Sequence, residues 1–199
     1  EGNRYIDGVS SLWCNVHGHR VKKIDDAIRS QLDKISHSTL LGLAQTKSIE
    51  LAEKLVKISP KNLCKVFYSD SGATSVEVAL KIAYQYYRNI GQKRDKFIAL
   101  GQSYHGDTIG SVSVGGIELF HSIFRPMLFD THFVPSPFPY RFAGSSEQCK
   151  QFTLDKIEEI LKKESGRICA VIAEPLVQGA AGIIVHPQGF LKGVRELTK

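Results

Sequence analysis

Residues 65–100 read KVFYSDSGATSVEVALKIAYQYYRNIGQKRDKFIAL, and this stretch decides the fold class. Its first four residues form a short β-prone run, which the polar turn Ser69–Gly72 breaks. A helical pattern follows to about Asn89, with apolar side chains on one face at Val76, Ala79, Leu80, Ala83 and Tyr87. Gly91 predicts the end of that helix, and residues 96–100 predict the next strand. This order of strand, turn, helix and strand indicates a parallel sheet.

The same alternation continues on both sides of this stretch. Amphipathic patterns predict helices over residues 22–35 and 45–58 before it, and around residues 154–161 after it. Residues 169–173 have the composition of a buried strand, and a last helix is expected from Gln188 onward. Strands that alternate with helices predict an α/β fold whose mainly parallel sheet carries helices on both faces.

Two segments lack such a pattern. The first twenty residues alternate loosely and contain three glycines, which suggests short strands and turns. Residues 130–146 are rich in Ser and Pro and are interpreted as a long surface excursion.

Composition excludes several classes of protein. Of 199 residues, 42% are hydrophobic and 23% are charged, which is typical of a globular chain and not of a disordered one. The net charge of +6 comes from mixed basic and acidic residues, so we expect an anionic small molecule and no nucleic acid as partner. No apolar run has the roughly 20 residues of a membrane helix, so no membrane association is expected.

The four cysteines, Cys14, Cys64, Cys149 and Cys169, have no regular spacing. They are interpreted as reduced, mostly buried thiols and not as a zinc site, which predicts a cytoplasmic protein without a metal. The absence of an initiator Met suggests that the natural chain begins earlier.

Three loops at predicted strand ends hold the unusual chemistry: residues 69–73, 101–108 and 174–182. In parallel sheets, ligands bind beyond the carboxyl ends of the strands. The first loop opens a long helix, whose free N–H groups and dipole favour an anion. From local sequence alone the favoured interpretation is a plain helix cap made by Ser71 or Asp70, and the loop lacks the P-loop signature.

The other two loops each allow two interpretations. Tyr104 offers a flat ring for stacking on an aromatic ligand, or it closes the core beneath its loop. Glu174 ends an apolar strand and is followed by Gln178 on a glycine-bearing loop. It has a hydrogen-bonding role at a site, or it ties down its own loop. His17 and His19 could be a metal pair, although no third ligand is near in sequence, and Trp13 is a core or a pocket residue.

Taken together and in this order, these motifs resemble the class III aminotransferases. The resemblance covers essentially the whole chain, and the stretches that carry it are residues 4–13, 17–19, 37–39, 67–72, 76–81, 104–110 and 174–180. The elements SLW, HGH and YHGDT favour the branch that forms 7,8-diaminononanoate in biotin synthesis.

The resemblance implies a fold-type I transferase that uses pyridoxal 5′-phosphate. Residues 1–36 would be an N-terminal segment of the small domain, and residues 37–199 the first part of the large domain. The residues that match the family's cofactor contacts are Ser71, Gly72, Ala73, Tyr104, His105, Glu174 and Gln178. Trp13 and Tyr104 match its substrate contacts.

The resemblance also implies a reaction. An amino group would pass from S-adenosylmethionine through the cofactor to 8-amino-7-oxononanoate, in a homodimer. The catalytic Schiff-base lysine is expected downstream of Lys199, so the chain by itself would be inactive. Two alternatives stay open: another class III enzyme acting on an ω-amino acid or ornithine, or a non-catalytic fragment if the chain ends at Lys199.

Overall fold

A computed structural model describes residues 2–199. The contacts within the chain divide it into two compact units, one that ends at Phe67 and one that runs from Tyr68 to Lys199. The expected boundary between residues 36 and 37 concerns the family's small and large domains, and it stays a prediction.

The first unit consists of short helices and connecting segments. Two of them, α2 (Lys22–Leu32) and α3 (Thr46–Ile58), confirm the helices expected from the apolar periodicity. The short strands expected in the first twenty residues are wrong, because none forms in their described part. Instead Ser10–Trp13, labelled α1, has positive φ at all four residues, from 49° to 69°. Such a left-handed turn costs L-amino acids roughly 1–2 kcal/mol per residue, so other contacts must hold it.

A parallel sheet forms the centre of the second unit. Its strands lie in the order β2 (His132–Val134), β1 (Lys96–Leu100) and β3 (Ile168–Ile172), and both pairings are parallel. In the register, Ile98 pairs with His132 and with Val171. A short antiparallel hairpin follows, made of β4 (Val177–Gln178) and β5 (Ile184–Val185).

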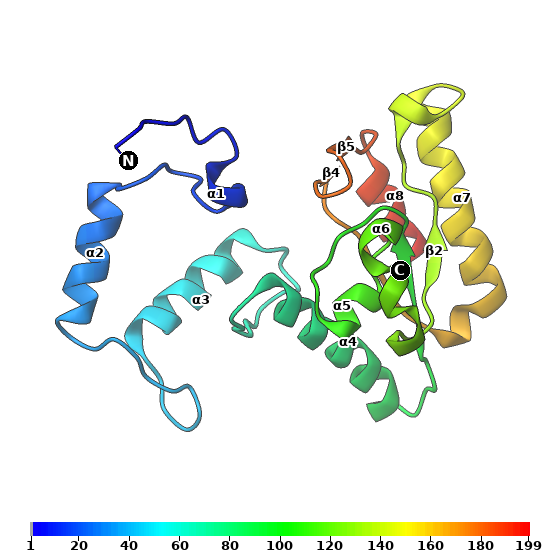
Figure 1. Cartoon of the computed structure of the whole chain (residues 1–199). Coiled ribbons are helices and arrows are strands. Elements are labelled where there is room, and N and C mark those ends of the chain that lie inside the picture. Colours follow the sequence, from blue (N-terminus) through cyan, green and yellow to red (C-terminus); the bar gives the residue numbers. More distant parts are fainter. Residues whose placement is uncertain (1) are drawn as a thin grey trace. The chain divides into compact units, whose positions relative to one another are not determined.

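Helices cover both faces of this sheet, as expected for a buried parallel sheet (Figure 1). Ile98 and Leu100 of β1 face a core made with α7 (Ser146–Glu164) and α8 (Phe190–Leu197). Phe97 and Ala99 point the other way, into a core with α4 (Gly72–Asn89). The remaining elements are short: α5 (Ile109–Ser113), α6 (Glu118–His121), and the 3₁₀ turns η1 (Ser122–Met127), η2 (Pro139–Arg141) and η3 (Ser165–Arg167). This is the mainly parallel α/β arrangement that the sequence predicts.

Two expectations about strands are wrong. Residues 65–68 form no strand, because no strand of the described chain pairs with them, and Phe67 is 70% exposed. Residues 130–146 are not a purely surface segment, because β2 lies within them and pairs with β1. A three-residue strand followed by Pro135 and Pro137 has too little sequence to be recognised, and its neighbour decides it.

All four cysteines are free, but only Cys149 and Cys169 are buried, so the expectation of mostly buried thiols is half right. Among residues 2–199, no helix combines the length and the apolar character that crossing a membrane requires.

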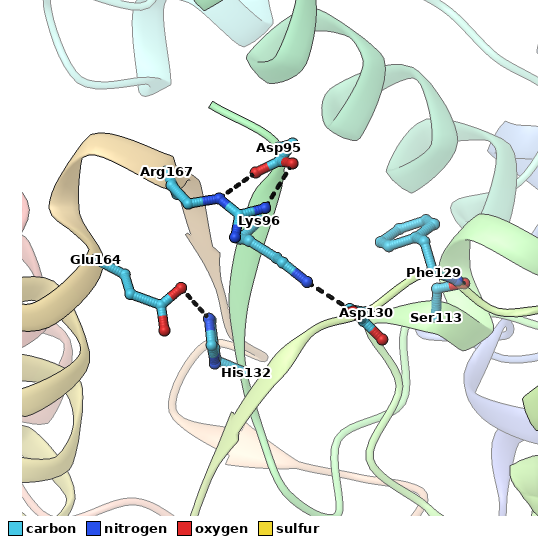
Figure 2. A network of polar contacts seen from close by, with 8 residues as sticks. All are labelled: Asp95, Lys96, Ser113, Phe129, Asp130, His132, Glu164 and Arg167. Atoms are coloured by element: carbon cyan, nitrogen blue, oxygen red, sulfur yellow. Dashed lines mark hydrogen bonds and ion pairs between the residues drawn. The ribbon is translucent and has the colours of Figure 1, made fainter. Parts of the chain in front are cut away.

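Charged residues gather at the amino ends of the three parallel strands (Figure 2). The Arg167 guanidinium donates two hydrogen bonds to Asp95, with distances of 3.0 and 2.7 Å. Lys96 pairs with Asp130 at 2.7 Å, and His132 lies 3.3 Å from Glu164. These pairs join segments that are 32 to 72 residues apart in the chain.

These ion pairs determine how the free energy of unfolding should change at acidic pH. Arg167 lowers the pKa of Asp95, and Lys96 lowers the pKa of Asp130. Both carboxylates therefore stabilise the fold above their ordinary pKa, and this contribution is lost as the pH falls through the lowered folded-state values. We expect Arg167→Gln to lower the urea midpoint modestly at pH 7, with a difference from wild type that shrinks toward pH 3. Lys93→Gln, at an exposed neighbour, is the control, and a difference that is constant with pH would contradict the prediction.

Candidate functional site

The first turn of α4 begins with a reciprocal cap. Ser71 is the N-cap, and its hydroxyl accepts a hydrogen bond from the Thr74 N–H at 3.2 Å. The Ser71 N–H in turn donates to Thr74 Oγ1 at 3.1 Å, and that hydroxyl donates to Asp70 at 2.7 Å. The interpretation of Ser71 as a helix cap is therefore correct, and its side chain serves the backbone of its own turn.

The cap leaves two donors of this turn unused. The N–H groups of Gly72 and Ala73 find no acceptor within the described chain, while those of Ser71, Thr74 and Ser75 all do. A Cβ added to Gly72 would meet nothing within 4 Å, so the space beside this N–H is open. Two free N–H groups at the positive end of an 18-residue helix are suited to an anion. The cap and the anion site are thus compatible.

The loop after β1 packs directly against this turn. Gly106 has a φ of +119°, and a Cβ there would come 2.4 Å from the Cβ of Ala73. The Ser111 hydroxyl donates to the Ala73 carbonyl at 3.0 Å. Glu77, one turn further along α4, accepts hydrogen bonds from the Thr108 hydroxyl at 2.5 Å and the Gly110 N–H at 2.8 Å. These contacts fix the loop that carries Tyr104 beside the free N–H groups.

Tyr104 is half-buried at the start of this loop. Its hydroxyl donates to Asp107 Oδ2 at 2.5 Å, and this bond, together with partial burial, raises the pKa of Tyr104. The phenol is therefore neutral at pH 7, and Asp107 restrains its ring. Tyr104 is not a core residue, which leaves the ring available for stacking.

Glu174 connects this loop to the loop after β3. Its Oε1 accepts from the Tyr104 N–H at 2.9 Å, and its Oε2 accepts from the Gly179 N–H at 2.8 Å. The interpretation that Glu174 ties down its own loop is confirmed, and the same carboxylate also holds the Tyr104 backbone, while its role at a ligand site stays a prediction. Gln178 is fully buried, and its amide donates to the Gly101 carbonyl at 2.9 Å and lies 3.2 Å from His186.

His105 lies next to Tyr104 and is half-buried. Burial, with a smaller effect from His121, lowers the pKa of His105 to about 4. The ring is therefore neutral at pH 7 and contributes no positive charge to the anion site. Its Nε2 is enclosed and has no hydrogen-bond partner in the described chain.

The second unit thus brings together the turn at Ser71–Ala73, the loop at Tyr104 and His105, and the loop at Glu174 and Gln178. Trp13 belongs to the first unit, where it is 55% exposed on the left-handed turn. In the described part of the chain no group of three potential metal ligands occurs.

Sequence reasoning assigned no role to several residues that build the site: Glu77, Gly106, Asp107, Thr108 and Ser111. One signal was available for Glu77, a single carboxylate within the apolar pattern of its helix. The close approach of Gly106 to Ala73 joins residues 33 positions apart, and no local pattern indicates it.

Comparison with known proteins agrees with this arrangement. The family model described as aminotransferase class-III matches residues 1–199. The chain belongs to the class III aminotransferases. In this family the parallel sheet, with helices on both faces, is part of the fold-type I fold that the sequence predicts.

Several curated relatives are named adenosylmethionine-8-amino-7-oxononanoate aminotransferase. The relative from Nitratidesulfovibrio vulgaris is 54% identical over 99% of this chain and 37% of its own length. The relative from Staphylococcus aureus is 53% identical over all of this chain and 45% of its own length. The chain thus spans less than half the length of these class III relatives.

Solved structures match as well. A crystal structure of the enzyme of that name from Methanocaldococcus jannaschii has a TM-score of 0.89 and 47% identity, over 98% of this chain and 42% of that one. An amine transaminase from an uncultivated Pseudomonas species, in its PLP-bound form, has a TM-score of 0.91 and 34% identity, over 98% of this chain and 46% of that one.

Proposed function

We propose that this chain is part of an aminotransferase that moves an amino group from S-adenosylmethionine to 8-amino-7-oxononanoate, giving 7,8-diaminononanoate in biotin biosynthesis. The observation that carries this proposal is the 47–54% identity, over essentially the whole chain, to relatives named for these two compounds. The proposed cofactor is pyridoxal 5′-phosphate, which the matching amine transaminase structure contains.

The described residues fit the phosphate of this cofactor. The unused N–H groups of Gly72 and Ala73 would hold the dianion, and the dipole of α4 would stabilise it. Because His105 is neutral, the phosphate would be held by backbone donors rather than by this imidazole. Ser71 would act through its cap, which holds the first turn in place.

The other site residues would orient the ring of the cofactor. Tyr104 would stack on it, while Asp107 holds the phenol and Glu174 holds the Tyr104 backbone. Gln178 and His105 would support these loops from behind. When bound, pyridoxal phosphate supplies the electron sink and carries the amino group between donor and acceptor.

The remaining expectations belong to the same proposal. Trp13 and Tyr104 are each proposed as contacts of the substrate. We also propose a homodimer and a cytoplasmic location, and the four free cysteines support a reducing compartment.

The decisive experiment is a comparison of amino donors in the enzyme that contains this chain. We expect 7,8-diaminononanoate to form from 8-amino-7-oxononanoate with S-adenosylmethionine and not with alanine, ornithine or ω-amino acids. Activity with an ω-amino donor alone would support the second candidate, an ω-transaminase. The observation that favours this candidate is the TM-score of 0.91 to an ω-transaminase from Thermomicrobium roseum at 33% identity.

The role proposed for Tyr104 predicts a graded loss in variants. Tyr104→Phe keeps the ring and loses the bond to Asp107, so we expect roughly tenfold lower kcat/KM with nearly unchanged cofactor affinity. Tyr104→Ala removes the stacking surface and should weaken pyridoxal phosphate binding roughly tenfold or more. Absorbance titration measures the cofactor affinity of both variants, and steady-state kinetics measure their kcat/KM. Tyr140→Phe, at a tyrosine 82% exposed, is the control, and unchanged affinity in Tyr104→Ala would contradict the role.

A further inference from the structure

The turn that carries Trp13 has an unusual backbone. Ser11 has φ and ψ of 49° and 53°, and Leu12 has 57° and 56°, close to the ideal left-handed helix. Ser10 and Trp13 on either side also have positive φ. None of the four residues is glycine, so the sequence at this turn opposes its own conformation. A backbone of this kind persists only where surrounding contacts determine it.

A carboxylate supplies these contacts. Asp7 Oδ1 accepts a hydrogen bond from the Ser11 N–H at 3.0 Å, and Oδ2 accepts one from the Ser11 hydroxyl at 3.1 Å. His19 Nε2 lies 2.8 Å from the same Oδ2. The Asn15 amide lies 3.1 Å from the other ring nitrogen of His19, so that Asn15 donates to Nδ1 while Nε2 donates to Asp7. The bonds from Ser11 and His19 lower the pKa of Asp7 to about 2, so the carboxylate is ionised throughout the neutral range.

Backbone bonds close the turn on either side. The Trp13 N–H donates to the Val9 carbonyl at 2.8 Å, and the Asn15 N–H donates to the Ser10 carbonyl at 2.9 Å. Hydrogen bonds from the residues before the turn and from the residues after it therefore hold the four strained residues. The two histidines of the HGH motif differ in their contacts. His19 is part of this network, whereas His17 has no side-chain partner in the described chain.

We propose that Asp7 and His19 are positioning residues, which hold residues 10–13 in the left-handed turn and thereby set the direction in which Trp13 meets the aliphatic chain of the amino acceptor. This inference rests on the proposed function, because it takes Trp13 as a substrate contact. In this proposal His19, the second histidine of the motif, fixes the geometry of the pocket wall and does not bind a metal.

The test uses the enzyme that contains this chain and a pair of linked variants. Asp7→Ala removes the acceptor of both Ser11 bonds, and we expect KM for the amino acceptor to rise roughly tenfold with kcat within about twofold. Adding Ser11→Gly should restore most of the wild-type KM, because glycine adopts positive φ without the support of the carboxylate. His19→Ala should resemble Asp7→Ala in a milder form, and His17→Ala is the matched control with wild-type KM.

A second readout does not depend on activity. The Trp13 emission is isolated by subtracting the spectrum of the same variant that also carries Trp13→Phe. The acrylamide quenching of this emission should change in Asp7→Ala. It should return to the wild-type value in Asp7→Ala/Ser11→Gly. An unchanged Trp13 signal in Asp7→Ala would overturn the positioning role. A changed signal with an unchanged KM would overturn the link to the substrate. A wild-type enzyme that is inactive on the two proposed substrates would overturn the proposed function. The Trp13 quenching would still test whether Asp7 holds the left-handed turn.

Discussion

Gly106→Ala is expected to weaken the binding of pyridoxal phosphate by about 30-fold or more. The new Cβ would lie 2.4 Å from the Cβ and 2.7 Å from the Cα of Ala73, so either the loop or the first turn of α4 must move. No flexible side chain can relieve the overlap, because the overlapping atoms are the Cα and Cβ of Ala73. The N–H of this same residue would hold the phosphate. The positive φ of +119° adds strain for any side chain. Overpacking of this kind costs about 1–3 kcal/mol, and 1.4 kcal/mol corresponds to a factor of ten in binding.

Equilibrium titration with the cofactor, with thermal unfolding of the cofactor-free protein beside it, measures this effect. Gly166→Ala is the matched control, because a Cβ at that position meets nothing within 4 Å and the residue is exposed. Wild-type cofactor affinity in Gly106→Ala would show that the turn at Gly72 and Ala73 is not the phosphate site.

Glu174→Ala is expected to have the second large effect. The carboxylate accepts the N–H groups of Tyr104 and Gly179 with its two oxygens, and its removal leaves two half-buried donors without partners. An unsatisfied donor of this kind costs about 1–3 kcal/mol. We therefore expect kcat/KM to fall roughly 100-fold and cofactor affinity to fall with it. Glu174→Gln should lose nearly as much, because an amide group has only one accepting atom and its NH₂ would face the second N–H.

Hydrogen exchange provides the specific readout for Glu174. The amides of Tyr104 and Gly179 should exchange faster in both variants, while amides in β1 keep their protection. Glu196→Gln changes a carboxylate on α8 that is 58% exposed, and it is the control. If Glu174→Gln retains wild-type kinetics and exchange, Glu174 does not position the tyrosine.

Several elements could be predicted from the sequence because their determinants are local. The apolar period marks α2, α3 and α4, and the polar turn at Ser69–Gly72 marks the start of α4. Buried apolar runs mark β1 and β3, and the order of these elements indicates a parallel sheet. Tyr104 and Glu174 could be selected because the loops after β1 and β3 are where such sheets bind ligands, and the candidate phosphate turn could be selected because it opens a long helix.

Other features could not be predicted, because partners distant in sequence decide them. The strand β2 exists through its pairing with β1, and residues 65–68 form no strand without such a partner. The second role of Glu174 depends on a donor 70 residues away, and the fit of Gly106 depends on Ala73.

The amino-acid sequence by itself determined the class of this fold, its longer helices and the loops that we propose to face a ligand, because periodicity, capping and turn preferences act over a few residues. Only the tertiary structure decided how these residues act together. It leaves the Gly72 and Ala73 N–H groups free, it directs both oxygens of Glu174 to two loops, and it holds the turn at Trp13 in a conformation that its residues disfavour. The physical reason is that hydrogen-bond satisfaction and steric exclusion depend on which distant groups meet, and the fold alone brings them together.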